Sequence, residues 1–192
     1  MNQEWIAVTD RKLCGGDFLK TVQTLAEQGL KTIILREKDL SEDEYGALAA
    51  RCMEICRKAG ASLTLHSYFR VARSLGADKI HLPYPVFLEN AGKIDQHVHV
   101  STSIHSPEEA VEAERMGAEF VIAGHIFQTD CKKGVPPRGL EFLKETVRSV
   151  SVPVYAIGGI SPYNIEDVLK TGAAGGCMMS GFMNSSKMID KL

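Results

Sequence analysis

The sequence has little net charge, few aromatic residues and no long apolar run. Its 192 residues carry 22 Lys and Arg against 24 Asp and Glu, which gives a formal net charge of −2. This balance offers no electrostatic basis for binding nucleic acid or an anionic membrane. No apolar stretch approaches the roughly 20 residues that span a bilayer. With 44% hydrophobic residues, the chain is predicted to form one globular domain over 1–192, without a nucleic-acid or membrane partner.

Cysteine is sparse and irregularly placed, and the first residues carry no targeting signal. The five cysteines are Cys14, Cys52, Cys56, Cys131 and Cys177. An odd number, without the spacing of a zinc site, favours reduced thiols over a disulfide framework. The start, MNQEWIAVTD, lacks the basic and apolar regions of a signal peptide. We therefore expect a cytoplasmic protein.

Short apolar runs recur along the whole chain and predict eight strands. Several are continuous runs of Val, Ile, Leu and Ala, as is typical of parallel strands covered on both faces. The expected strands are Trp5–Thr9, Thr32–Arg36, Ser62–His66, Lys79–Leu82, Val98–Ser103, Phe120–Gly124, Val154–Gly158 and Gly176–Ser180.

Helix-like segments with recognisable ends separate these runs. The first extends from Asp17 to Gln28, and the second begins at a capping box formed by Ser41 and Glu44. Two more are expected to start at Ser-Pro pairs, because proline suits the first position of a helix. These pairs are Ser106-Pro107 and Ser161-Pro162, and the helices should end near Gly117 and Gly172.

Eight strands joined by helical crossovers predict a single, compact (β/α)8 TIM barrel, for which about 250 residues is typical. An open, doubly wound sheet is the alternative, but the first strand–helix turn lacks the GxGxxG pattern. Residues 83–92 contain two prolines and predict a short helix or an irregular segment after the fourth strand. Residues 184–192 predict a short final helix, and a second copy in a homodimer could cover the flank of the barrel that a short helix leaves exposed.

In a barrel, the carboxyl ends of the strands and the loops after them build the active site. Arg36 and Lys38 follow the second strand on one side of an extended chain, which suits a phosphate or carboxylate, although a solvated turn is the alternative. Ser103 and His105 end the fifth strand. His97, His99 and Ser103 share one face of the expected strand and could bind a metal ion there, but no acidic residue accompanies them. We therefore expect no metal ligands and no cofactor.

The loop after the sixth strand, GHIFQTDCKKG, combines several reactive groups. Gly124 allows close approach of a ligand, and His125 is the residue type suited to proton transfer near neutral pH. Thr129 and Lys132 add hydrogen-bond donors, with Lys133 beside them. Cys131 is a weaker candidate for a nucleophile, because a thiol in a loop is commonly a bystander.

The last two strand ends are rich in glycine. Gly158 and Gly159 follow the seventh strand, and Ser180 and Gly181 follow the eighth. Barrels often bind phosphate with backbone N–H groups of these two loops. The alternative is that these glycines only turn the chain.

Five segments together resemble the thiamin phosphate synthase/TenI superfamily. They are LREK (35–38), STSIH (101–105), GHIFQTDCKKG (124–134), YAIGGI (155–160) and GGCMMSG (175–181). The similarity runs in order through nearly the whole chain. GHIFQTDCKKG is the most specific segment and is similar to the TenI thiazole tautomerase version of this loop, where the synthases usually have proline in place of His125.

The sequence departs from the synthases where their magnesium ligands lie. The resemblance implies an Asn-Asp pair after the third strand and a Gly-Gln-x-Asp segment after the fourth, but this chain has His66-Ser67 and HLPYPV (81–86) there. Ile34 replaces the usual glutamine before the Arg-x-Lys pattern. Mg²⁺ prefers carboxylate oxygens, so the chain lacks the expected ion-binding residues.

The resemblance therefore implies a metal-free thiazole tautomerase of thiamin biosynthesis, with His125 as its acid–base group. Its substrate would be a thiazole phosphate carboxylate. Arg36 is the candidate for binding the carboxylate, and Lys132 and Ser103 are lesser candidates. Two alternatives remain open: a thiamin phosphate synthase with other metal ligands, and a non-catalytic, TenI-like regulatory protein that binds such phosphates.

Overall fold

In the computed structural model, which describes residues 4–184, eight strands form a closed parallel barrel in the order β1 to β8. The (β/α)8 TIM barrel is thus confirmed, and the open sheet is wrong. The strands are β1 (Glu4–Val8), β2 (Thr32–Leu35), β3 (Ser62–His66), β4 (Lys79–Pro83), β5 (His99–Ile104), β6 (Phe120–Gly124), β7 (Val154–Ile157) and β8 (Gly175–Met178).

Helices follow the strands along the chain. The α-helices are α1 (Phe18–Glu27), α2 (Glu42–Ala59), α3 (Phe69–Leu75), α4 (Tyr84–Asn90), α5 (Pro107–Arg115), α6 (Gly139–Ser149), α7 (Ile165–Leu169) and α8 (Ser180–Asn184). Three short 3-10 helices are η1 (Arg11–Leu13), η2 (Ala91–Lys93) and η3 (Asp130–Lys132). The short helix expected after the fourth strand is α4, while the expected final helix over 184–192 lies, beyond its first residue, outside the described residues.

The contacts divide the chain into two compact units. Of the described residues, one unit contains Glu4 and His81–Met178, and the other contains Trp5–Ile80 and residues 179–184. We call them the His81–Met178 unit and the Trp5–Ile80 unit. The assignment of 1–192 to one domain stays a prediction.

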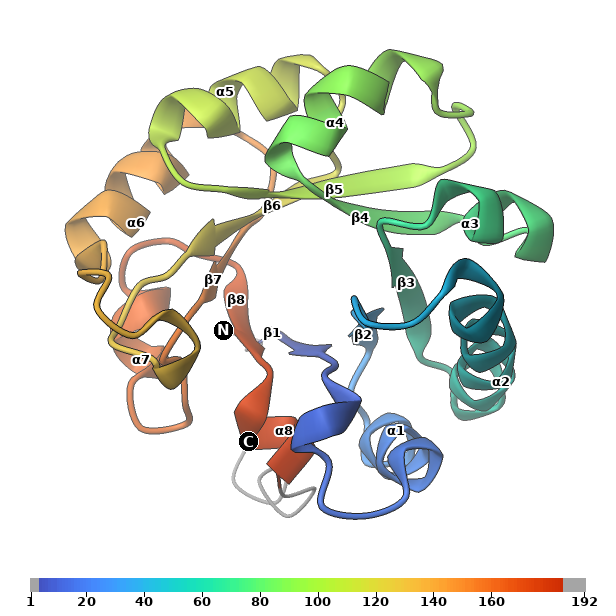
Figure 1. Ribbon diagram of the computed structural model, residues 1–192. Helices are drawn as coiled ribbons and strands as arrows, with labels where there is room; N and C mark the ends of the chain where they lie inside the picture. Colours follow the sequence, from blue (N-terminus) through green and yellow to red (C-terminus); the bar gives the residue numbers. More distant parts are fainter. Residues whose placement is uncertain (1–3, 185–192) are drawn as a thin grey trace. The chain divides into compact units, whose positions relative to one another are not determined.

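In the Trp5–Ile80 unit, strands β1, β2 and β3 pair in parallel. Ile33 lies opposite Ala7 on one side and Leu63 on the other. The side chains of Ile33 and Leu65 are fully buried, as the continuous apolar runs predict. Helices α1 and α2 pack side by side over this part of the sheet (Figure 1).

Helix α2 begins and ends as its sequence predicts. Ser41 Oγ accepts a hydrogen bond from the Glu44 N–H, and the Glu44 carboxylate accepts one in return from the Ser41 N–H. Gly60, with φ of 70°, ends the helix in the left-handed conformation that glycine adopts at little cost. The capping box is therefore confirmed.

In the His81–Met178 unit, β5 pairs with β6, β6 with β7, and β7 with β8, all in parallel. Helix α5 packs beside α6 (Figure 1). Ser106 caps α5 by accepting from the Glu109 N–H, and Pro107 occupies the first helical position as expected. The strand boundaries agree with the prediction to within two residues.

The start of α7 differs from the prediction. Ser161-Pro162 does not open the helix, which begins at Ile165. Asn164 Oδ1 accepts a hydrogen bond from the Ser161 N–H at 2.9 Å, and Asn164 Nδ2 donates to the Gly159 carbonyl. This asparagine stabilises a turn in the segment where the helix was expected, because its amide competes with helical hydrogen bonds.

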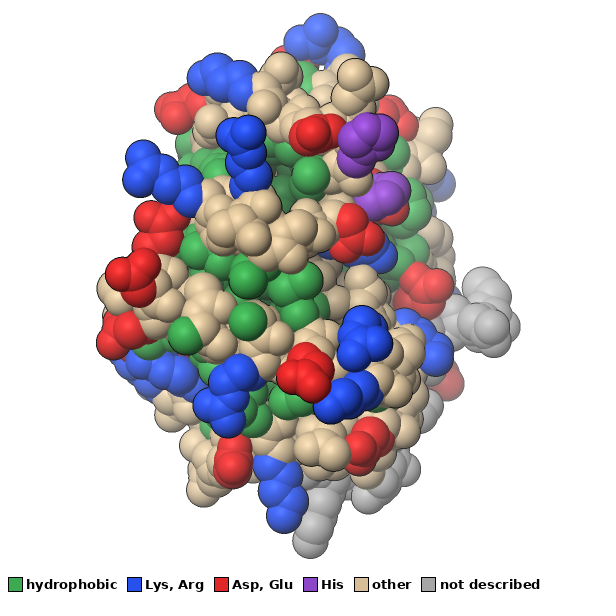
Figure 2. Space-filling view, turned by 90° about the vertical axis from the view of Figure 1, so that its right-hand side faces the viewer, with side chains coloured by type: hydrophobic (Ala, Val, Ile, Leu, Met, Phe, Trp, Pro, Cys, Tyr) green, Lys and Arg blue, Asp and Glu red, His purple; other side chains and the backbone are tan. Residues whose placement is uncertain are grey.

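Acidic and basic side chains are found together over the face drawn in Figure 2. This mixture agrees with the small net charge of the sequence. Among the described residues, none of the helices combines the length and apolar character needed to cross a bilayer.

Two glycines should respond in opposite ways to alanine substitution. A Cβ at Gly175 would overlap the Glu4 carbonyl group, whereas a Cβ at Gly46 in α2 would only touch Val71, at 3.7 Å. We expect Gly175→Ala to lower the free energy of unfolding by about 1–3 kcal/mol through overpacking. Gly46→Ala should raise it by about 0.5–1 kcal/mol, because alanine favours the helix. Urea denaturation measures both, and a stable Gly175→Ala variant would contradict the packing described.

Candidate functional site

His125 directly follows β6, and its side chain is almost fully buried. Its imidazole Nε2 lies 3.2 Å from the carbonyl oxygen of Val135. Gly158 packs against it, since a Cβ at Gly158 would overlap the His125 side chain and lie 2.8 Å from its Cα. The ring is therefore held between the loop that follows it and the end of β7.

The loops after β6 and β7 are joined along their backbones. The N–H of Ile126 donates to the Ile157 carbonyl at 2.9 Å, and the N–H of Phe127 donates to the Gly158 carbonyl at 2.9 Å. Gly159 has φ of 66°, and a Cβ there would lie 2.7 Å from the Phe127 Cβ. Both predicted phosphate-binding glycines, Gly158 and Gly159, thus have a packing role, and phosphate binding stays a prediction.

Thr129 has a structural role that the sequence did not reveal. Its hydroxyl caps η3 by accepting from the Cys131 N–H at 3.4 Å, which directs Thr129 toward its own loop. Cys131 is exposed, and Lys133 pairs with Asp130 at 3.6 Å on the surface. The Thr129 hydroxyl is thus already hydrogen bonded within its own loop, and binding of a substrate by Thr129 stays a prediction.

Cations gather near the end of β5. Burial lowers the pKa of His105, Glu109 opposes this shift, and Lys132 and Arg138 lower the pKa further by charge repulsion. Lys132, a predicted substrate-binding residue, is thus brought into the neighbourhood of Arg138. Glu109 also accepts a hydrogen bond from the His105 N–H at 2.6 Å. His105 is in this way fixed at the start of α5.

Ser103 is held by a histidine that the sequence did not single out. Both ring nitrogens of the buried His81 are hydrogen bonded to hydroxyl groups on β5, Nδ1 to Ser101 and Nε2 to Ser103, each at 2.8 Å. The imidazole lies near the Phe120 ring in a stacked arrangement. Ser103 is therefore oriented by a hydrogen bond to His81 on the neighbouring strand. The residue pattern of β5 alone could not reveal this contact.

The possible metal site on β5 does not form. His97 and His99 are exposed, His99 pairs with Glu119 at 3.3 Å, and Ser103 is instead hydrogen bonded to His81. Within residues 4–184, no three His, Cys, Asp or Glu side chains come together in a way that could hold a metal ion.

In the Trp5–Ile80 unit, Arg36 and Lys38 flank a buried carboxylate. Glu37 accepts from the Thr9 hydroxyl at 2.6 Å and from the Arg11 backbone N–H at 3.1 Å. Glu37 is thereby tied into the β1–α1 connection, while β2 ends at Leu35 and Lys38 already lies in the turn that follows. The expectation that Arg36 and Lys38 share one side stays a prediction.

His66 ends β3 within reach of the same two cations. Its pKa is lowered to about 3, first by burial and then by the charges of Arg36 and Lys38. Tyr45 links the two strand ends, because its hydroxyl donates to the Leu35 carbonyl at 2.7 Å and accepts from the His66 N–H at 2.9 Å. The ends of β2 and β3 are thus linked through one buried hydroxyl group.

Ser180 and Gly181 belong to the Trp5–Ile80 unit, where they begin α8. Phe182 in this helix packs edge-on against Trp5, with ring centroids 6.3 Å apart. This contact fixes the helix on β1. The phosphate-binding role of Ser180 and Gly181 stays a prediction.

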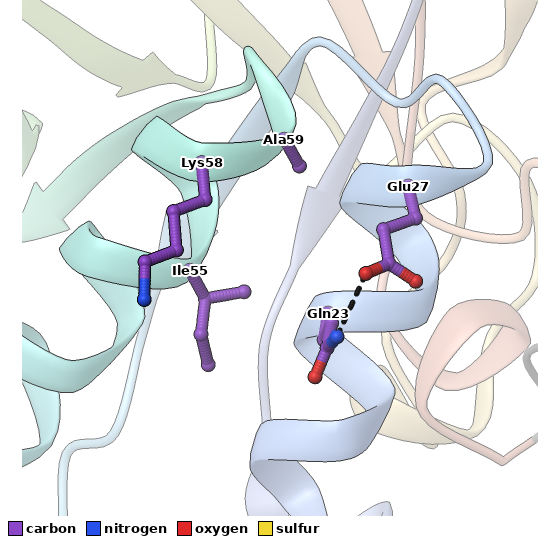
Figure 3. Close-up of a pocket in the computed structure, with 5 residues that line it drawn as sticks. All are labelled: Gln23, Glu27, Ile55, Lys58 and Ala59. Carbon is purple, nitrogen blue, oxygen red and sulfur yellow. Dashed lines mark hydrogen bonds between the residues drawn. The ribbon is translucent and has the colours of Figure 1, made fainter.

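A groove in the Trp5–Ile80 unit lies away from these strand ends. It has a volume of roughly 230 Å³ and lies between α1 and α2 near the points where both helices end (Figure 3). Gln23 donates to Glu27 there at 2.7 Å. Because the ends of α1 and α2 lead into the starts of β2 and β3, the groove lies at the opposite end of these two strands from Arg36 and His66. It is lined by Gln23, Glu27, Ile55, Lys58 and Ala59.

Comparison with known proteins identifies the family. Residues 5–182 match the family described as thiamine monophosphate synthase. The chain belongs to the thiamine monophosphate synthase family. A "Putative thiamine-phosphate synthase 2" of Aquifex aeolicus is 37% identical over 178 residues, covering 92% of this chain and 96% of that protein. A thiamine-phosphate synthase of Syntrophomonas wolfei is 34% identical, covering 93% and 88%.

A solved structure agrees with this membership of the thiamine monophosphate synthase family. The thiamine phosphate pyrophosphorylase of Pyrococcus furiosus has a TM-score of 0.83 at 29% identity, and the alignment covers 98% of this chain and 91% of that one. The thiamin phosphate synthase/TenI resemblance is therefore confirmed at the level of the superfamily. This chain belongs to an enzyme family of thiamin biosynthesis.

The residues at two strand ends do not fit the magnesium ion that the synthase resemblance implies. The chain continues after β3 with Ser67, whose hydroxyl lies 2.9 Å from His66 Nδ1. β4 ends at Pro83 and leads directly into Tyr84 at the start of α4. Imidazole, hydroxyl and proline groups do not supply the carboxylate oxygens that Mg²⁺ prefers.

The buried His66 should make stability depend on pH. Its folded pKa is about 3 against an ordinary value of 6.5, so below pH 6.5 the unfolded chain binds the proton more readily and stability falls. We expect a loss of about 1.4 kcal/mol per pH unit between about pH 6 and pH 4 from this group. His66→Asn should flatten that slope in urea denaturation, whereas His97→Asn, at an exposed histidine, should not. Equal slopes in the wild type and His66→Asn would contradict the burial of a neutral His66.

Proposed function

We propose that this protein is a thiazole tautomerase, which aromatises a carboxythiazole phosphate by moving a proton within one substrate. The observation that carries the proposal is His125: a histidine directly after β6, buried and held between two loops. In the resemblance to the synthases, this position is usually proline, which cannot transfer a proton. The histidine also matches the TenI form of the loop.

The proposed chemistry requires one group that removes and returns a proton. The C–H bond at the ring carbon breaks, and its electron pair forms a new double bond within the ring. The double bond between the ring and the exocyclic carbon breaks in turn, and its electron pair forms the new C–H bond when the exocyclic carbon takes up the proton. The reaction is an isomerisation, so no co-reactant is needed. One imidazole that reaches both carbons can serve as base and then as acid, and such transfer is typically worth about 10²–10⁴ in rate.

The other predicted residues would bind the charged groups of the substrate. Arg36 is our candidate for the carboxylate, because a guanidinium can form two parallel hydrogen bonds with it. Lys38, Ser103 and Lys132 are further candidates. For the phosphate we retain the glycine-rich strand ends, Gly158, Gly159, Ser180 and Gly181.

A second candidate is the thiamin phosphate synthase reaction, and the names of the relatives favour it. They are named thiamine-phosphate synthase at 34% identity over nearly the whole chain. Against this stands the chemistry of the groups after β3 and β4. The pyrophosphate of the synthase substrate needs a counter-ion, and these groups are poor magnesium ligands.

A magnesium test separates the two reactions. The purified protein is assayed for aromatisation of the dehydrothiazole phosphate carboxylate, and separately for joining thiazole phosphate to the pyrimidine pyrophosphate, each with EDTA and with added Mg²⁺. We expect aromatisation at the same rate in both conditions. Coupling that depends on Mg²⁺, without aromatisation, would establish the synthase instead.

His125→Gln should separate an enzyme from a regulatory binding protein. Glutamine keeps a polar side chain but cannot act as an acid–base group near neutral pH, so turnover should fall at least about tenfold. Binding of the aromatic product phosphate, measured by calorimetry, should persist. His97→Gln, at an exposed position, is the matched control, and unchanged turnover in His125→Gln would contradict the assignment.

Arg36→Ala should weaken substrate binding while the fold stays intact. Loss of the guanidinium removes a charge-assisted pair with the carboxylate, so KM should rise about tenfold or more, the order expected for a hydrogen bond to a charged group. Arg51→Ala, at an exposed arginine of α2, is the control. If both variants bind like the wild type, Arg36 does not bind the carboxylate.

A further inference from the structure

The loop after His125 folds back onto the residues where it begins. The N–H of Arg138 donates to the His125 carbonyl at 3.0 Å, and Arg138 Nε donates to the Gly124 carbonyl at 3.1 Å. The N–H of Gly139 donates to the Ile126 carbonyl at 3.0 Å. Arg138 therefore fixes, through backbone and side chain, both carbonyl groups that flank the backbone of His125.

The contact between the imidazole and Val135 determines which nitrogen carries the hydrogen. A carbonyl oxygen can only accept, so the 3.2 Å contact with His125 Nε2 requires a hydrogen on Nε2. In a neutral imidazole the other nitrogen, Nδ1, then holds the lone pair. The backbone of the loop thus selects Nδ1 as the atom that can accept a proton.

The chain between Val135 and Arg138 is stiff. Pro136 and Pro137 have fixed φ angles, and the residue before a proline is restricted to extended conformations. The Val135 N–H also donates to the Lys132 carbonyl at 3.2 Å. The carbonyl that contacts the ring is therefore held at a defined position relative to Arg138.

Arg138 is itself oriented by the helix that it precedes. Its guanidinium lies over the Phe142 ring, 5.4 Å from the centroid, within α6. A guanidinium over an aromatic face is attracted by the ring and still has N–H groups that can donate, as Arg138 Nε does to the Gly124 carbonyl. A lysine could supply the charge and N–H donors at this place, but not the planar guanidinium.

We propose that Arg138 is a positioning residue for His125, and that the Val135–Arg138 segment holds the ring as the Nε2–H tautomer with Nδ1 as the base. The catalytic consequence rests on the proposed tautomerase activity; the tautomer itself does not. Arg138 acts through the backbone of Gly124 and His125. It therefore should affect the rate of proton transfer more than the binding of substrate.

The tautomer is read directly by NMR. The protein is labelled with ¹⁵N-histidine, and long-range proton–nitrogen spectra are recorded above pH 8, with the His125 signals assigned by their loss in His125→Gln. In the wild type we expect the cross-peak pattern of a His125 ring that carries its hydrogen on Nε2. In Arg138→Gln we expect a mixture of the two tautomers. A wild-type His125 with its hydrogen on Nδ1 would overturn the proposal.

The kinetic test uses Arg138→Gln, Arg138→Lys and a control. In Arg138→Gln, kcat should fall at least about tenfold, with KM within about twofold, because positioning of the base is lost and substrate binding is kept. Arg138→Lys should recover part of the loss. Arg148→Gln removes the same charge from an exposed site at the end of the same helix and should behave like the wild type.

The outcomes distinguish this proposal from the proposed function. If the wild type does not aromatise the thiazole, the proposed tautomerase activity is wrong. The NMR experiment still tests whether Arg138 positions His125, because it measures the tautomer without any substrate. Wild-type kcat and a single tautomer in Arg138→Gln would overturn the role of Arg138. Should Arg138→Gln unfold, as judged by circular dichroism, Arg138→Lys is the deciding variant, and wild-type behaviour there in both readouts would overturn the proposal.

Discussion

The close approach of two backbones, at Gly158 and His125, is the constraint on which this part of the molecule depends. The His125 side chain occupies the space that a Cβ at position 158 would fill. The chain therefore needs a residue without a side chain there, and the hydrogen bonds from Ile126 and Phe127 to the β7 loop follow from that approach. The Arg138 contacts then fix the loop from the other side. The loop after β6 is thus held by contacts from the β7 loop and from Arg138.

Buried polar groups organise the strand ends elsewhere in both units. In the Trp5–Ile80 unit, Tyr45 bridges Leu35 and His66, and Glu37 gathers hydrogen bonds from the β1–α1 connection. In the His81–Met178 unit, His81 joins two serines of one strand. Buried polar groups are costly unless they are paired, so each such network favours one arrangement of its strand ends. Rigid strand ends are what a binding site for small charged groups requires.

The barrel could be predicted from the sequence because its signals are local and repeated. The continuous apolar runs, the Ser41 and Ser106 caps and the glycine stops each indicate an element on their own. The start of helix α6 was not predicted, because Arg138 before it forms no side-chain cap. The start of α7 was predicted too early, because the Asn164 turn depends on a contact with the Gly159 carbonyl.

The candidate site was predictable only in part. His125 could be found from its residue type and its place after a strand, whereas the roles of His81 and Arg138 depend on partners that are distant in the sequence or on the far side of a loop. Thr129 is the converse case, since a residue type that suits substrate binding serves as a helix cap. Local patterns indicate which groups are present, and long-range contacts decide what each group is available to do.

The two consecutive prolines at 136 and 137 have a consequence for binding energetics. A loop with fixed φ angles has few conformations available. It therefore loses little further conformational entropy when a ligand binds, because most of that entropy is already lost on folding. A ligand that reaches such a loop meets a surface already in its final shape. Ligands that contact this loop would then be selected by how well they fit its fixed conformation, because the loop cannot change its shape to accommodate them.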